Sequence, residues 1–161
     1  METPALDEMK ASLAASQAEY ERLLDGVNEA TLHARPLPNE WTMAENLVHM
    51  ANARTFFVGE TRRVLAEPGT RMGRTVDDVG RLQAIALHGG DSQAAIREAM
   101  QTTHATQMQL FNDLQPADLQ VMGVHVKRGP QTLGAFVHHF LVEHNEAHVQ
   151  QIKELLVVAG K

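Results

Sequence analysis

Three histidines, His49, His144 and His148, are the residues of this sequence best suited to binding a metal ion. His144 and His148 lie four positions apart in a segment whose apolar residues recur at helical spacing. Side chains four apart on a helix lie one above the other, with Cβ atoms about 5–6 Å apart. The pair stands where the apolar pattern calls for Leu or Ile, and burying an imidazole without a partner costs on the order of 1–3 kcal/mol. A shared cation would explain both positions.

A metal site needs a third ligand, because two imidazoles alone hold an ion weakly. His49 is the best candidate, since it lies two turns into a predicted helix among apolar residues. Neutral imidazole is a common ligand of divalent metals, with Zn–N bonds of about 2.0–2.1 Å. We therefore predict one divalent metal ion bound by His49, His144 and His148.

Each of these histidines also has an interpretation without metal. A histidine pair at this spacing is often structural or exposed, and a lone histidine in an apolar stretch is often a hydrogen-bonded core residue. The zincin motif is missing, because Glu146 does not directly follow His144. Glu-x-x-His does not occur either, which argues against a two-metal carboxylate site. We interpret the remaining histidines as non-ligands: His33, His88, His104, His125, His138 and His139.

A proton-transfer partner is harder to identify. Glu45 and Asn52 lie one turn to either side of His49, and Glu143 directly precedes the histidine pair. Glu45 also completes a capping box that begins at Thr42, which explains it without catalysis. Glu45, Asn52 and Glu143 are therefore weak candidates, and the sequence identifies no catalytic residue.

Four long segments with helical periodicity must position these side chains. They cover residues 5–27, 42–65, 91–114 and 132–158. Residues 76–88 are expected to form a short helix and residues 121–126 a short extended segment. Four amphipathic helices pack best as a four-helix bundle, so we predict an all-α fold in a single domain spanning residues 1–161.

Composition narrows the class of protein. Aromatic residues make up 4% of the chain, so Leu, Ala, Val and Met must fill the core, which favours helices. The net charge of −6 and the lack of a basic tract argue against nucleic-acid binding. There is no cysteine, which excludes disulfides and thiolate ligands. Neither a membrane-spanning run nor a secretory signal is visible, so we expect a cytoplasmic protein with no membrane partner.

Five arginines are scattered through the middle of the chain. They are Arg62, Arg63, Arg71, Arg74 and Arg81. We interpret them as part of a solvated face or loop, and contact with an acidic cosubstrate is the alternative.

The sequence resembles the DinB-like superfamily, small four-helix proteins regarded as metalloenzymes. The resemblance is carried by residues 41–49, by residues 131–134 and by residues 143–152, which include His-x-x-x-His. In that family a tryptophan-led second helix supplies one histidine and the last helix supplies two. Carried over to this chain, the metal ligands are His49, His144 and His148. The resemblance further implies an up-down-down-up bundle, bound zinc, nickel or iron, and frequent homodimers.

The family includes metal-dependent hydrolases and S-transferases or isomerases that use low-molecular-weight thiols such as bacillithiol or mycothiol. We therefore expect a metal-dependent enzyme that activates water or a thiol for a small-molecule substrate, as a hydrolase or a thiol S-transferase. The alternative is a non-catalytic bundle with a structural, interaction or metal-binding role. Histidine ligands must be deprotonated, so metal affinity is expected to fall below pH about 6.5.

Overall fold

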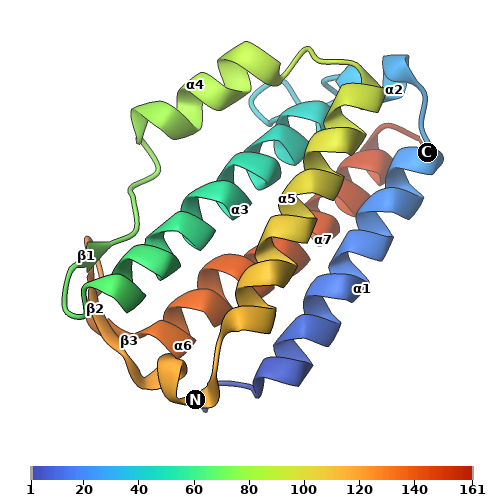
Figure 1. Ribbon diagram of the computed structural model, residues 1–161. Helices are drawn as coiled ribbons and strands as arrows, with labels where there is room; N and C mark the ends of the chain where they lie inside the picture. Colours follow the sequence, from blue (N-terminus) through green and yellow to red (C-terminus); the bar gives the residue numbers. More distant parts are fainter. Residues whose placement is uncertain (1, 161) are drawn as a thin grey trace.

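Four long helices dominate the computed structural model, which describes residues 2–160 (Figure 1). They are α1 (Leu6–Asp25), α3 (Met43–Ala66), α5 (Gln93–Asp113) and a last helix made of α6 (Leu133–Val137), η2 (His138–Glu143) and α7 (His144–Val158). Shorter helices connect them: α2 (Glu29–His33), α4 (Val79–His88) and η1 (Pro116–Gln120). The chain runs up in α1, down in both α3 and α5, and up again in the last helix (Figure 1). The predicted four-helix bundle and its topology are confirmed.

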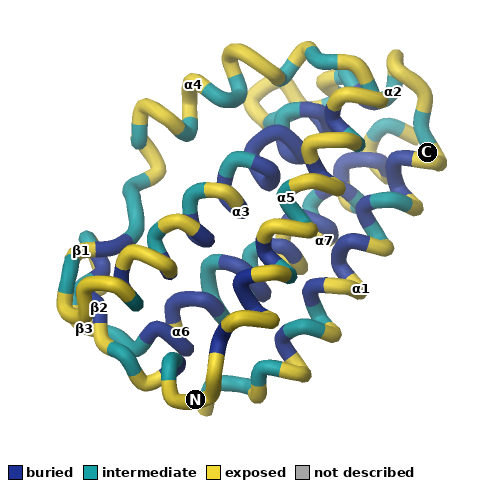
Figure 2. Tube along the Cα trace, in the orientation of Figure 1, coloured by how far each residue is buried: buried dark blue, intermediate teal, exposed yellow. Residues whose placement is uncertain are grey.

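The parallel course of α3 and α5 depends on the long connection between them. After α3 the chain passes through a short strand and returns along the outside of α3 as α4, so that α5 starts at the same end as α3 (Figure 1). None of the residues of α4 is buried, because this helix packs over the bundle rather than within it (Figure 2). The predicted short helix at residues 76–88 is therefore present, although it begins three residues later.

Capping residues set the starts of three of the four long helices, and the capping box predicted at Thr42 and Glu45 is one of them. The hydroxyl of Thr42 accepts a hydrogen bond from the backbone N–H of Glu45 at 3.0 Å, and the carboxylate of Glu45 accepts one from the N–H of Thr42 at 2.9 Å. This reciprocal capping box satisfies two backbone donors that the first turn would leave free. Ser92 and Thr132 cap α5 and the last helix with one hydrogen bond each, in which the hydroxyl accepts from a backbone N–H in the first turn.

A small three-stranded sheet closes one end of the bundle. Its order is β1 (Arg71–Met72), β2 (Met122–His125) and β3 (Gly129–Thr132), with β1 parallel and β3 antiparallel to β2. The extended segment predicted at residues 121–126 is β2. Strands β1 and β3 are too short to be predicted from sequence patterns. They form because each pairs with β2. Gly123 allows the close packing here, since a Cβ atom at this position would lie 2.7 Å from the sulfur of Met72.

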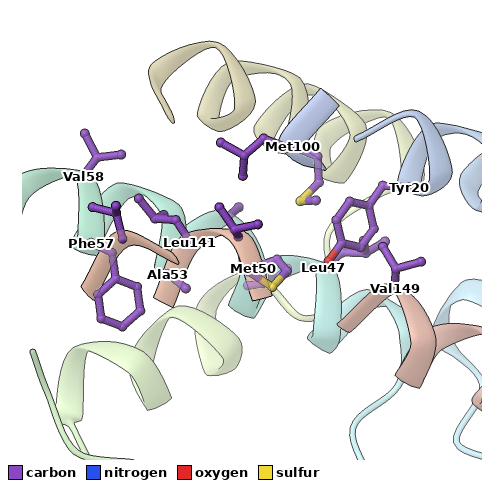
Figure 3. Packing of buried hydrophobic residues seen from close by; sticks show 14 of the residues in the cluster. Tyr20, Leu47, Met50, Ala53, Phe57, Val58, Met100, Leu141 and Val149 are labelled. Atoms are coloured by element: carbon purple, nitrogen blue, oxygen red, sulfur yellow. The ribbon is translucent and has the colours of Figure 1, made fainter. Parts of the chain in front are cut away.

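The core lies between the facing sides of the long helices, where the buried residues gather (Figure 2). Leu, Met, Ala and Val supply most of it, as the composition predicts, and Figure 3 shows part of this cluster, including Leu47, Met50 and Met100. Burial of apolar side chains at about 25 cal/mol per Å² is the main stabilising contribution to such a bundle. Within residues 2–160, no helix has the length and the apolar character needed to cross a membrane.

Candidate metal centre

His49 on α3 and the pair His144 and His148 on α7 converge inside the bundle. Their ligand nitrogens all lie within 4.8 Å of one another. The Nε2 atom of His144 is 3.3 Å from Nε2 of His49 and 3.1 Å from Nε2 of His148. Two nitrogens bound to the same tetrahedral zinc at about 2.0–2.1 Å would lie about 3.3 Å apart. The donor set and its spacing therefore fit a single ion.

Burial keeps the three imidazoles neutral. His49 is 3% exposed and His148 is 9% exposed, whereas His144 is half-buried. Loss of hydration lowers the pKa of His144 to about 3 and that of His148 to about 4, and it lowers the pKa of His49 further still. Neighbouring imidazoles contribute to the low pKa values of His49 and His144. Neutral rings are the form that binds a metal.

Asn46 sets the tautomer of His148. The amide nitrogen of Asn46 donates a hydrogen bond to the carbonyl of Thr42 at 3.0 Å, and its oxygen lies 3.1 Å from Nδ1 of His148. Since this oxygen only accepts, Nδ1 of His148 carries the proton and Nε2 presents its lone pair to the cluster. Sequence reasoning missed Asn46, which is fully buried. A polar side chain one turn before His49 on a buried helix face was the available signal.

The Nδ1 atoms of His49 and His144 are also buried, and neither has a hydrogen-bond partner among residues 2–160. The cluster as described thus leaves polar ring atoms unsatisfied inside the bundle. Such groups are costly in a protein interior and are commonly explained by function.

An open cavity of about 460 Å³ leads to the three histidines. Phe57, Phe140 and Val76 give it apolar walls, while Arg74 and Arg81 bring positive charge. These residues come from α3, from the connection after β1, from α4 and from the last helix. A small molecule in this cavity would lie directly against the histidine cluster.

The three weak catalytic candidates lie in different places relative to the histidine cluster. Glu143 lines the cavity, and its carboxylate lies 2.9 Å from Nδ1 of His139. Glu45 is used in the capping box and in a 2.7 Å ion pair with Arg35, and it is not part of the cavity wall. Asn52 faces a different cavity, between α3, α4 and α5. The structure therefore gives a place at the site to Glu143 alone.

The interpretation of the arginines as a solvated set is wrong for two of the five. Arg62, Arg63 and Arg71 are exposed as expected, but Arg74 and Arg81 are partly buried in the cavity wall. Their positions depend on the pairing of β1 with β2 and on the return path of α4. Local sequence patterns do not encode either feature.

His139 lies in the cavity wall, although it is not one of the three histidines that converge. It lies five residues before His144, a spacing that places side chains about 140° apart on a regular α-helix. The π-helical segment η2 interrupts the last helix here, and its wider turn brings residues five apart closer to the same face. His139 consequently lines the same cavity as His144. The Nε2 atom of His139 accepts a hydrogen bond from Nη2 of Arg128 at 2.8 Å.

The family model of the DinB superfamily matches residues 12–152. The chain belongs to the DinB superfamily. No curated protein sequence matches it significantly. The family resemblance noted in the sequence is thereby confirmed, and the three converging histidines stand at the positions which that resemblance implies.

Solved structures share the fold at low sequence identity. A mycothiol-dependent maleylpyruvate isomerase matches with a TM-score of 0.76 and 14% identity over 94% of this chain; the chain spans 63% of that enzyme. YfiT from Bacillus subtilis, described as a probable metal-dependent hydrolase with an unusual four-helix bundle topology, matches with a TM-score of 0.73 and 15% identity over 97% of this chain and 90% of its own. A Streptococcus pneumoniae protein matches with a TM-score of 0.75 and 12% identity, covering 98% of this chain and 93% of its own.

Proposed function

We propose that this protein is a metal-dependent enzyme in which His49, His144 and His148 bind one divalent metal ion. The observation that carries the proposal is the convergence of three neutral imidazoles, two buried and one half-buried, beside an open cavity large enough for a small molecule. We expect zinc or nickel, with iron as a further option, because imidazole suits all three.

Three neutral ligands leave the charge of a divalent ion uncompensated, so that when bound it supplies Lewis-acid activation of a water molecule or a thiol. The chain contributes the surroundings. Phe57 and Phe140 give the cavity beside the cluster apolar walls, and Glu143 is the carboxylate in the described cavity wall that is placed to accept a proton. The hydrogen bond with His139 holds Glu143 in that place.

The two solved relatives support two reactions. One is named as a thiol-dependent isomerase and the other as a probable hydrolase. We accordingly propose thiol S-transfer or hydrolysis, with a low-molecular-weight thiol as the partner in the first case. A homodimer is part of the proposal on the family resemblance, and analytical ultracentrifugation tests it: a single species at the monomer mass would refute it.

Elemental analysis of the protein without a histidine tag tests the metal site. We expect about one divalent ion per chain in the parent and none in His49→Ala, His144→Ala or His148→Ala, because each variant removes one of three ligands. The matched control is His88→Ala, which changes an exposed histidine paired with Asp91 and should keep the metal. Stoichiometric metal in all three ligand variants would refute the site.

Activity is tested next, on the metal-loaded protein, with a panel of thiol acceptors and a panel of esters and amides. Turnover that disappears in His144→Ala identifies the reaction class. The non-catalytic alternatives predict other results. A structural module would hold no metal, even after incubation with zinc or nickel, and a chelator would not change its melting temperature. A metal-binding protein would hold metal without turnover.

A further inference from the structure

Arg74 is a buried cation in the cavity wall whose charge is poorly balanced. Its side chain is 7% exposed, and its Nη1 atom lies 3.7 Å from Oδ1 of Asp78. That oxygen already accepts a hydrogen bond from the backbone N–H of Arg81 as the cap of α4. The Nη2 atom of Arg74 is buried and has no hydrogen-bond partner among residues 2–160. A guanidinium group left in this state favours an additional acceptor.

The position of Arg74 is preorganised by aromatic rings. Its guanidinium carbon lies 4.4 Å from the ring centroid of Phe56 and 5.7 Å from that of Phe57. Contact with ring faces holds the planar group in place through cation–π attraction. The side chain of Arg74 is therefore already ordered, and ligand binding costs little further conformational entropy at this residue.

Arg81 supports the same region from α4. Its guanidinium lies 4.8 Å from the ring centroid of Trp41, and its Nη1 atom donates a hydrogen bond to the carbonyl of Val76 at 2.6 Å. Val76 is two residues beyond Arg74, so this bond anchors the segment that carries the first arginine. Both cations line the cavity that contains the histidine cluster.

The charges of the described cavity wall do not cancel. Two guanidinium groups line the cavity with one carboxylate, that of Glu143, which is already paired with His139. The carboxylate of Asp78 also lies 3.7 Å from Arg74, but it is engaged as the cap of α4. The described lining therefore carries one more positive than negative charge, whereas the whole chain has a net charge of −6. A divalent ion on the histidines would increase the positive excess in the cavity. An anionic ligand would compensate it.

We propose that Arg74 and Arg81 form a subsite that binds the carboxylate group of a small molecule beside the histidine cluster. This molecule would be a substrate only if the proposed function holds. Its binding to the arginines does not depend on that function. A guanidinium group matches a carboxylate with two parallel hydrogen bonds. The apolar walls formed by Phe57, Phe140 and Val76 suit the carbon skeleton of such a molecule.

A carboxylate fits this subsite better than a phosphate group. Phosphate is typically bound by backbone N–H groups at the start of a helix. The nearest helix start, that of α4, is capped by Asp78, whose carboxylate occupies the N–H of Arg81 and would repel a dianion. The arginine side chains therefore remain as the donors. Guanidinium groups pair with carboxylate and phosphate alike, so it is the apolar lining of the cavity that favours a carboxylate with a carbon skeleton.

Titration with butyrate, followed by NMR chemical shifts of the full chain, tests the subsite. Butyramide is the neutral isostere, and inorganic phosphate is the competing anion. We expect metal-free protein to bind butyrate at least about tenfold more tightly than butyramide. Arg74→Gln and Arg81→Gln should each weaken butyrate binding by about tenfold or more, since each removes a charged donor. Arg62→Gln, which changes an exposed arginine paired with Asp113, should bind butyrate as the parent does.

Several outcomes would overturn the subsite. They are equal affinity for butyrate and butyramide, parent-like butyrate binding in both Arg74→Gln and Arg81→Gln, and binding of phosphate where butyrate does not bind. The amide spectrum of each variant reports folding in the same experiment, and an unfolded Arg74→Gln leaves Arg81→Gln to decide.

Metal content measured on the same samples separates this inference from the metal site. Butyrate binding that requires zinc and survives Arg74→Gln would place the carboxylate on the metal, which overturns the subsite and leaves the metal site intact. Arginine-dependent butyrate binding by a chain that never takes up metal would refute the metal site and leave the subsite intact.

Discussion

Asn46 supports the histidine cluster through a hydrogen bond with one of its three members, His148. Through its oxygen it fixes which nitrogen of His148 carries a proton, and its own orientation is held by the carbonyl of Thr42. Hydrogen bonds of this kind orient a ligand and raise its basicity. The first turn of α3 thus contributes both the helix cap and the support for a histidine on α7.

Replacing Asn46 by Ala should weaken metal binding without removing a ligand. We expect metal affinity to fall by about 10- to 100-fold, because His148 loses the acceptor that holds its tautomer. Competition with a zinc-sensitive chelating dye measures the change. Asn52→Ala is the matched control on the same helix, since Asn52 faces another cavity. Equal affinity in the parent and in Asn46→Ala would show that the hydrogen bond does not orient the ligand.

Among the helices, Arg54 and Asn145 form the polar link that holds the bundle in register. Arg54 on α3 is fully buried and donates to the side-chain oxygen of Asn145 through Nε at 3.0 Å and Nη2 at 2.8 Å. It also donates to the carbonyl of Met100 on α5 at 2.9 Å, and the hydroxyl of Tyr20 on α1 donates to the carbonyl of Asn145 at 2.8 Å. Burial lowers the pKa of Arg54 to about 10, which leaves it charged at neutral pH.

Asn145→Ala should therefore be strongly destabilising. The substitution leaves a buried cation without two of its hydrogen bonds, and each hydrogen bond to a charged group is typically worth about 1.5–3 kcal/mol. Urea unfolding of the metal-free protein measures the loss. The double variant Arg54→Met with Asn145→Ala removes the charge as well and should be less unstable than the sum of the two single changes. Strict additivity would mean that the two side chains are not coupled.

Across the whole molecule, buried histidines make stability depend on pH. Burial lowers the pKa of His104 to about 4, in addition to the low pKa values of His49, His144 and His148. In the unfolded chain each of these imidazoles takes up a proton near pH about 6.5. At pH values between the low pKa of each folded-state imidazole and its unfolded-state pKa, the unfolded state binds more protons than the folded state. The free energy of unfolding therefore falls as pH falls.

We expect metal-free protein to lose stability between pH 7 and pH 5, approaching about 1.4 kcal/mol per pH unit for each of these histidines. Urea midpoints at several pH values measure the slope. His104→Gln removes one titrating group away from the metal cluster and should make the slope shallower. An unchanged slope in that variant, or constant stability over the range, would contradict the expectation.

The same pKa values alter the expected pH dependence of metal binding. The sequence predicts that affinity falls below pH about 6.5, the ordinary pKa of histidine. In the folded protein the proposed ligands His144 and His148, with pKa values of about 3 and about 4, stay neutral well below pH 6.5. We therefore expect the metal to be retained well below pH 6.5 and to be lost when the fold itself fails.

The features that sequence patterns identified are those that depend on neighbouring residues. The capping box at Thr42 and Glu45 acts within one turn, and the pairing of His144 with His148 follows from the pitch of a helix. Apolar periodicity likewise located the four long helices to within a few residues. Such signals are local, so they can be read without knowledge of what each element packs against.

The remaining features of the site depend on residues far apart in the chain. Arg74 and Arg81 enter the cavity because β1 pairs with β2 and α4 returns over α3. Asn46 acquires its role from His148, which lies 102 residues away. His139 reaches the cavity because a π-helical turn changes the phase of the last helix. Side-chain periodicity indicates which face of a helix is buried, but only packing between helices determines which neighbours and charges meet there.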